Sequence, residues 1–172
     1  ANCTSLSQMF LIDAVTSIGA SAFTGCTSLQ SVTLPNTLTT LGASAFANCS
    51  KLQNVSLPNA LTSIANETFA NCVQLQTVSN MGAVASIGEN AFTGCVALAQ
   101  ISLSGSLQSI ANNAFYNCSS LQNVYFASNV NAWANISFSN ANANPLYYGA
   151  KLFDANNNLV TNVFFENGVD TI

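Results

Sequence analysis

Two consecutive stretches of the chain have almost the same sequence: IGASAFTGCTSLQSVTLP at residues 18–35 and LGASAFANCSKLQNVSLP at residues 41–58. The step from Ile18 to Leu41 continues along the chain, because the same motif returns at Ile64, Ile87 and Ile110. A fixed period, here about 23 residues, is typical of solenoids, in which each repeat is one structural unit. The two stretches therefore predict a stack of similar units.

Five apolar positions keep this period. A single unit could not bury its apolar side, but stacked units would join these positions into one continuous core. We expect two of them to form structural ladders, Cys3, Cys26, Cys49, Cys72, Cys95 and Cys118, and Phe23, Phe46, Phe69, Phe92 and Phe115. The other three columns are represented by Leu29, Ile18 and Val32.

Each unit contains a strand pattern and a short helical pattern. Residues 29–35 alternate apolar and polar side chains, which predicts a strand with one face inward. Residues 21–26 are too few for a lasting helix and predict a single helical turn. Pro35 and Pro58 close their strands, where a missing N–H does least harm.

These motifs resemble the BspA-like class of leucine-rich repeats, which occurs in bacterial and protist surface proteins. The resemblance is strongest in residues 18–38 and in IGENAFTGCVALAQISLSGSL at residues 87–107. It implies a right-handed β/α superhelix with parallel strands and short helical turns, about 23 residues per rung. It also implies a secreted or cell-surface protein that acts in adhesion or partner recognition. Asn80, where neighbouring repeats have leucine, indicates an irregular rung.

The repeat is regular over residues 1–126 and is then interrupted. We expect an insertion at about 127–160, containing a hairpin-like segment, in one solenoid domain of 172 residues that is part of a longer array. The repeat is expected to resume at 161–172, because four residues there have the spacing of Val32, Leu34, Leu38 and Leu41. These four residues are Val163, Phe165, Val169 and Ile172.

Composition excludes several classes of partner. The chain has two Lys, no Arg, no His and six acidic residues. Phosphate recognition depends on Lys and Arg, so nucleic acid is not expected as a partner, and neither is an anionic membrane surface. No apolar run approaches the roughly 18 residues of a membrane span. Low charge density also removes the repulsion that opposes self-association.

The cysteines are interpreted as small buried core residues. The alternative is a ladder of disulfides, since their number is even. Equivalent Cβ atoms on stacked strands would lie about 4.8 Å apart, whereas a disulfide needs about 3.8 Å. Zinc ligands converge on one point, and these cysteines follow a line, so we expect no metal site.

Residues 126–160 suggest two binding sites. Trp133, Tyr147 and Tyr148 could form an aromatic patch that stacks on sugars, or they could cover the core where the repeat is broken, which we favour. Asp154, Asn156 and Asn158 resemble the start of a calcium loop, but Leu159 stands where glycine is required, so a plain turn is favoured.

No catalytic constellation is evident. Without His and Arg, the commonest general acid, base and anion-binding groups are missing. Glu67 and Glu89 are one unit apart but out of register, and a solvent-exposed position is expected for both. We expect no enzyme activity and no cofactor.

Two functional hypotheses remain. An extended polar face, with a column of glutamines, could bind a protein or a glycan outside the cell. Alternatively, uncapped ends could stack head to tail and form a fibre or surface lattice from copies of the chain, with contacts at the four residues that follow the insertion. The glutamine column consists of Gln30, Gln53, Gln76 and Gln122.

Overall fold

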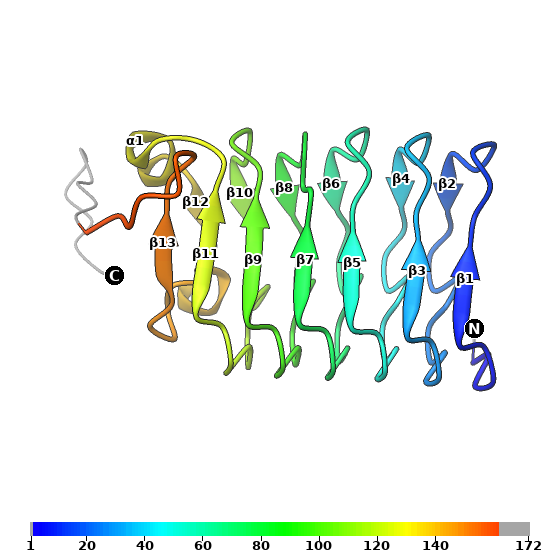
Figure 1. Cartoon of the computed structure of the whole chain (residues 1–172). Coiled ribbons are helices and arrows are strands. Elements are labelled where there is room, and N and C mark those ends of the chain that lie inside the picture. Colours follow the sequence, from blue (N-terminus) through cyan, green and yellow to red (C-terminus); the bar gives the residue numbers. More distant parts are fainter. Residues whose placement is uncertain (1, 162–172) are drawn as a thin grey trace.

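The structure is a computed structural model that describes residues 2–161, and Figure 1 shows these residues as a row of stacked units. Each unit, called a rung, adds one strand to a long sheet and a shorter strand to a second wall. The long sheet contains β1 (Gln8–Phe10), β3 (Ser31–Thr33), β5 (Asn54–Ser56), β7 (Thr77–Ser79), β9 (Gln100–Leu103), β11 (Asn123–Phe126) and β13 (Lys151–Phe153). The short strands are β2 (Ser17–Ile18), β4 (Thr40–Leu41), β6 (Ser63–Ile64), β8 (Ser86–Ile87), β10 (Ser109–Ile110) and β12 (Ser137–Phe138).

Equivalent residues of successive repeats are direct neighbours in the seven-stranded sheet. Met9 pairs with Val32, and Val55 pairs with Val78, in parallel register. Each pair is separated by one period of the sequence, so the chain completes one rung between one strand and the next. The prediction of a parallel-stranded leucine-rich-repeat solenoid with about 23 residues per rung is confirmed.

The third wall of each rung consists of hydrogen-bonded turns, where the sequence predicted a helical turn. The N–H of Thr24 donates to the carbonyl of Ser21 in the same turn, at 3.3 Å. The N–H of Phe23 instead donates to the carbonyl of Ala45 in the next rung, at 2.8 Å. This alternation of local and inter-rung bonds joins the rungs on this wall as well, so the turns act as a third bonded layer.

Two columns of residues with left-handed backbone explain why no helix forms in the turns of the regular rungs. A positive φ reverses the direction of the chain and ends the helical path, and Gly and Asn adopt it at least cost. One column is Asn2, Gly25, Asn48, Asn71, Gly94 and Asn117, and the other is Ser21, Ser44, Glu67, Asn90 and Asn113.

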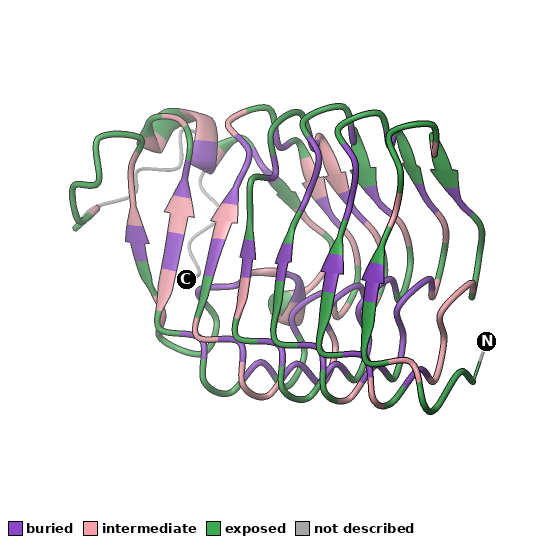
Figure 2. Ribbon diagram, turned by 45° about the vertical axis from the view of Figure 1, so that its right-hand side comes forward, coloured by how far each residue is buried: buried purple, intermediate pink, exposed green. Residues whose placement is uncertain are grey.

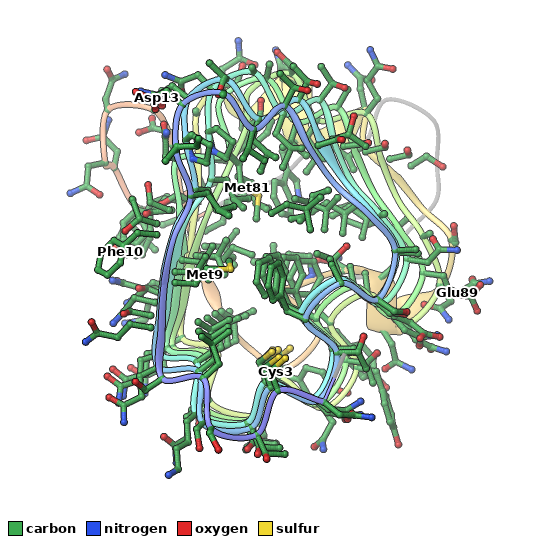
Figure 3. The ribbon with its side chains drawn as sticks, turned by 90° about the vertical axis from the view of Figure 1, so that its right-hand side faces the viewer. Cys3, Met9, Phe10, Asp13, Met81 and Glu89 are labelled. Atoms are coloured by element: carbon green, nitrogen blue, oxygen red, sulfur yellow. The ribbon has the colours of Figure 1, made fainter. Side chains whose placement is uncertain are left out.

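The phenylalanine column forms a continuous stack through the core. Successive rings from Phe23 to Phe115 have centroids 5.4, 5.8, 5.5 and 5.4 Å apart and are nearly parallel. The four from Phe46 onward are completely buried. Figure 2 shows the buried segments running along the inside of the stack, and in Figure 3 Met9 and Met81 also point inward.

The cysteine column also connects neighbouring rungs. The Cys49 thiol donates to the carbonyl of Phe23 at 3.2 Å, and the Cys72 thiol donates to the carbonyl of Phe46 at 3.1 Å. Cys95 and Cys118 repeat this contact. The cysteines are free and five are buried, whereas Cys3, on the outermost rung, is exposed.

The segment expected to be an insertion contributes an enlarged rung up to Phe153. Leu152 pairs with Val124, and Phe138 pairs with Ile110. The two residues of each pair are separated in the sequence by more than one regular period. The number of extra residues equals the length of the helix α1 (Val130–Ala134). A short 3-10 helix, η1 (Ala141–Ala143), lies in the turn wall.

After β13, the chain turns back through a single antiparallel bridge between Phe153 and Leu159. This bridge is the described part of the expected hairpin. The expected return of the repeat at Val163, Phe165, Val169 and Ile172 lies outside the described residues.

We expect the substitution Phe69→Ala to lower the free energy of unfolding by about 3–5 kcal/mol, because it leaves a cavity in the middle of the ring stack. Phe69→Leu should cost less, since it fills more of the space. Urea denaturation measures both, with Ser79→Ala on the surface as the control, expected within about 0.5 kcal/mol of the parent. A loss below about 1 kcal/mol for Phe69→Ala would contradict a rigid core stack.

Candidate functional site

The outward side chains of the seven-stranded sheet form a regular surface along the described stack. They occupy the first and third positions of each strand and are called the outer sheet face below. The middle position points into the core, as Met9 does while Phe10 points away (Figure 3). The outer sheet face consists of Gln8, Phe10, Ser31, Thr33, Asn54, Ser56, Thr77, Ser79, Gln100, Ser102, Asn123, Tyr125, Lys151 and Phe153.

The outer sheet face is almost free of charge. Lys151 is the one charged residue among its members, all of which are described. Amide and hydroxyl side chains make up most of the rest, and some bond across rungs, as Thr77 does to the amide oxygen of Asn54 at 2.5 Å. Such a surface offers hydrogen bonds but no strong electrostatic attraction.

A low floor of hydroxyl residues lies between aromatic residues on this face. The third strand position holds Phe10 in β1, four small residues in the next four strands, and Tyr125 in β11. The four small residues are Thr33, Ser56, Ser79 and Ser102. Five strand spacings separate Phe10 from Tyr125, about 24 Å at the usual 4.8 Å. We call this strip the hydroxyl trough.

Tyr125 and Phe153 form an aromatic pair that the sequence analysis did not identify. Their ring centroids are 5.1 Å apart, with 23° between the ring planes. Both side chains are partly exposed. The signal that could have found this pair is the equivalence of β11 and β13, which the enlarged rung conceals.

The outer sheet face contains a shallow hollow between β3 and β5. It measures about 240 Å³ and is lined by Thr33, Asn36, Ser56, Pro58 and Asn80, with apolar residues beneath. The hollow lies beyond the single register pair of these two strands, Ser31 with Asn54.

Hydrogen bonds between rungs are missing at the same level. The N–H of Leu11 donates to Thr33 at 3.4 Å, and the N–H of Leu57 donates to Ser79 at 3.0 Å. Within the described residues, no equivalent bond joins the N–H of Leu34 to Ser56.

The short strands are interrupted at this level too, because β2 and β4 form one sheet while β6, β8, β10 and β12 form another. Pro35 and Pro58 stand at matching positions of these two rungs, and neither nitrogen can donate a hydrogen bond. This boundary between the second and third rungs is called the seam.

The glutamine column lies at the margin of the outer sheet face. Gln30, Gln53, Gln76 and Gln122 each precede a strand of the long sheet by one residue, and all four are exposed. Their backbones continue the hydrogen bonding between rungs, as the N–H of Gln53 donates to the carbonyl of Gln30 at 3.2 Å.

The expected aromatic patch is divided. Trp133 is 1 % exposed and packs against Phe126 and Phe138 in the core, so its ring is not available to a ligand. Tyr147 and Tyr148 are exposed and meet edge to face at 5.1 Å. The Tyr148 hydroxyl also accepts a hydrogen bond from the backbone N–H of Asn117, at 3.1 Å, so this tyrosine braces a turn.

The acidic residues within positions 2–161 occupy turns. Glu67 and Glu89 are exposed, and Glu67 accepts a hydrogen bond from the Ser44 hydroxyl at 3.0 Å. The Asp154 carboxylate accepts from the backbone N–H groups of Asn156 and Asn158, both at 2.9 Å. These bonds lower the pKa of Asp154 and close a tight turn after β13. Among the described residues, no group of three or more His, Cys, Asp or Glu could hold a metal ion.

The buried thiols are held in their neutral form. Burial raises the pKa of Cys49 and of Cys118 to about 12, and it raises that of Cys95 as well. Because the thiolate is the reactive form of cysteine, these ladder residues are chemically inert in the folded chain. They stabilise the core and do not form a reactive site.

Comparison with known proteins identifies the family. A profile of the BspA type leucine-rich repeat region matches six copies, in segments 1–100 and 45–167. The chain therefore belongs to the BspA-type leucine-rich repeat family. No curated protein matches the chain significantly.

Solved structures of bacterial leucine-rich repeat proteins share the fold. A leucine-rich cell surface protein from Faecalibacterium prausnitzii is 30% identical, with a TM-score of 0.72, over 76% of this chain and 34% of its own. A leucine-rich repeat protein from Bacteroides ovatus is 32% identical, with a TM-score of 0.68, over 73% and 34%. One from T. pallidum is 27% identical, with a TM-score of 0.67, over 77% and 69%. The chain thus spans about a third of the first two proteins.

Within residues 2–161, no helix is long and apolar enough to cross a membrane.

The raised thiol pKa values predict a loss of stability at alkaline pH. Above the ordinary thiol pKa of 9.0, the unfolded chain loses thiol protons that the folded chain keeps. The free energy of unfolding should therefore be unaffected by these groups below pH 9 and fall as pH rises toward 12.

The test compares the parent with Cys118→Ala in urea at pH 8 and pH 10, with a reductant present. The variant should lose about 1 kcal/mol less between the two pH values. An identical loss in both proteins would show that Cys118 ionises equally when folded.

Proposed function

We propose that this chain is a non-catalytic binding protein that acts outside the cell and recognises an uncharged partner through its outer sheet face. The observation that carries the proposal is that face itself, an exposed and regular surface with a single charge. Membership of the BspA-type family and similarity to a cell surface protein support a surface location. Recognition on such a face serves adhesion, because solenoids present extended surfaces to large partners.

The chemistry of the described chain supports binding and not catalysis. The carboxylates lie in separate turns, the thiols are neutral and buried, and His and Arg are absent from the sequence. The polar side chains of the outer sheet face can orient a partner by hydrogen bonds, each contributing about 0.5–1.5 kcal/mol net. Affinity would then come from many weak contacts repeated along the stack.

We test this function with beads that carry the chain and are placed on surfaces coated with mucin, collagen, laminin or a neutral polysaccharide. The double variant Thr33→Lys with Ser79→Glu places one positive and one negative charge on the outer sheet face, where a bound partner would bury them. The net charge of the chain does not change. We expect retention on the recognised surface to fall at least about tenfold, since desolvating unpaired charges is costly.

The matched control carries the same two charges on the short-strand wall of the same rungs, as Thr40→Lys with Ser86→Glu. It should retain the binding of the parent. Equal retention of the parent and the outer-face variant, or no retention on any surface, would contradict the proposed function.

A second candidate function is end-to-end association into a fibre or surface lattice. Phe10 and Ile12 favour it, because they are 74% and 72% exposed on the outermost rung of the described stack. One edge of β1 is also unpaired within the described residues, and an open edge strand is a template for pairing with another chain.

Light scattering over a dilution series tests this association. Assembly should depend on concentration and stop in the variant Ile12→Lys, while Val73→Lys, which charges an exposed residue outside the outermost rung, should assemble like the parent. A monomer at every concentration would rule out this second function.

A further inference from the structure

We propose that the hydroxyl trough, closed at one end by Tyr125, binds a neutral polysaccharide chain. This inference rests on the proposed function and names the class of partner. It assigns the contact to the ring of Tyr125 and to the polar residues beside it. The polymer would lie along the trough and across successive strands.

Tyr125 presents one face of its ring to the trough. Phe153 covers the opposite face, in the stacked arrangement with centroids 5.1 Å apart. On the trough side, the register partner of Tyr125 is Ser102, whose side chain is too short to cover a ring. The stack of Phe153 and Tyr125 therefore ends in a ring face that Ser102, on the next strand, does not cover.

A pyranose ring has the shape and chemistry to occupy the space above Ser102, beside the free face of Tyr125. Its apolar C–H face can pack flat against the free face of Tyr125, while its hydroxyl groups remain at the edges. Phe153 supports the tyrosine from behind and restricts its rotation, so little side-chain entropy is lost on binding. The Tyr125 hydroxyl has no hydrogen-bond partner within the described residues and is available to the ligand.

Hydrogen-bonding groups surround this space beside the free face of Tyr125. Asn123 lies two residues before Tyr125 on the same face, and its register partners are Gln100 and Lys151. These amide and ammonium groups can donate to sugar oxygens, and the amide oxygens can accept from sugar hydroxyls. Ser102 and Ser79 continue the supply of hydroxyl groups along the floor.

The trough fits a neutral and repetitive partner better than a folded protein. Protein partners usually insert an aromatic or arginine anchor into an apolar pocket near the centre of the interface. Here the central positions are hydroxyl residues, and the hollow between β3 and β5 carries Asn36, Ser56 and Asn80 around an apolar base of Val32, Leu34 and Leu57. An acidic polymer would find a single cation, Lys151, on the whole outer sheet face.

Affinity electrophoresis tests the proposal with defined polymers. The purified chain is run in native gels that contain galactomannan, xyloglucan, mixed-linkage β-glucan or soluble starch, and in a gel with polygalacturonate as the charged polymer. We expect retardation by at least one neutral polymer and none by polygalacturonate.

Three variants locate the site. Tyr125→Ala should weaken binding about tenfold or more, the scale of one lost aromatic stacking contact. Ser102→Leu should also weaken it, because the branched aliphatic side chain would cover the free face of Tyr125 without offering a flat ring of its own and without removing any core contact. Tyr147→Ala, an exposed tyrosine outside the outer sheet face, is the control and should bind like the parent.

The outcomes separate this inference from the proposed function. If no neutral polymer retards the chain, or if Ser102→Leu binds like the parent, the polysaccharide site is wrong. When bead retention on collagen or laminin nevertheless depends on the outer sheet face, the partner is a protein and the proposed function stands. Retardation by polygalacturonate alone would also overturn the site, because it would assign the contact to charge.

Discussion

Parallel backbone pairing between rungs sets a strand spacing of about 4.8 Å, and the rest of the structure depends on it. Every side chain lies directly beside its equivalent in the next repeat, so each column must hold residues that tolerate contact with their own kind. Phenylalanine rings stack, thiols bond to the neighbouring carbonyl, and asparagines pair, as Asn71 does with Asn48 at 3.2 Å. Like charges at this spacing repel, so a column of one repeated charge is disfavoured, and the chain of 172 residues carries eight charged side chains.

The same constraint shapes the outer surface. A column that excludes charge leaves Ser, Thr, Asn and Gln to cover the sheet, and their repetition produces a uniform polar face. Distinct features then arise where the repeat changes. Tyr125 and Phe153 replace the small residues of earlier rungs, and the stacked prolines Pro35 and Pro58 coincide with the weakest pairing. The proposed recognition site and the irregular strand pairing thus both lie where the repeat changes.

The sequence predicted those parts of the structure that depend on periodicity. The constant spacing identified the strands, the parallel stack and the inward columns, because each of these requires only equivalent positions. Of the two left-handed columns, the one with Gly25 and Asn48 has a compositional signal that went unused, whereas Ser21 and Glu67 in the other share none. The equivalence of β13 and β11, and with it the aromatic pair, was missed because the residues of α1 shift Leu152 out of phase with Val124. Trp133 was weighed as a ligand contact, although it fills the core beside Phe126 and Phe138.

The seam divides the described stack into a short block that ends with β4 and a longer block that begins with β5. In a solenoid, each rung contacts mainly its neighbours, so resistance to a pulling force is set by the weakest interface between adjacent rungs. At the seam, the long sheet keeps one register pair and the short strands keep none, while the turn wall remains bonded, as from Phe46 to Thr68 at 2.9 Å. Under tension, the stack would open on two walls and hinge on the third. A solenoid built in this way can extend under mechanical load before any rung unfolds.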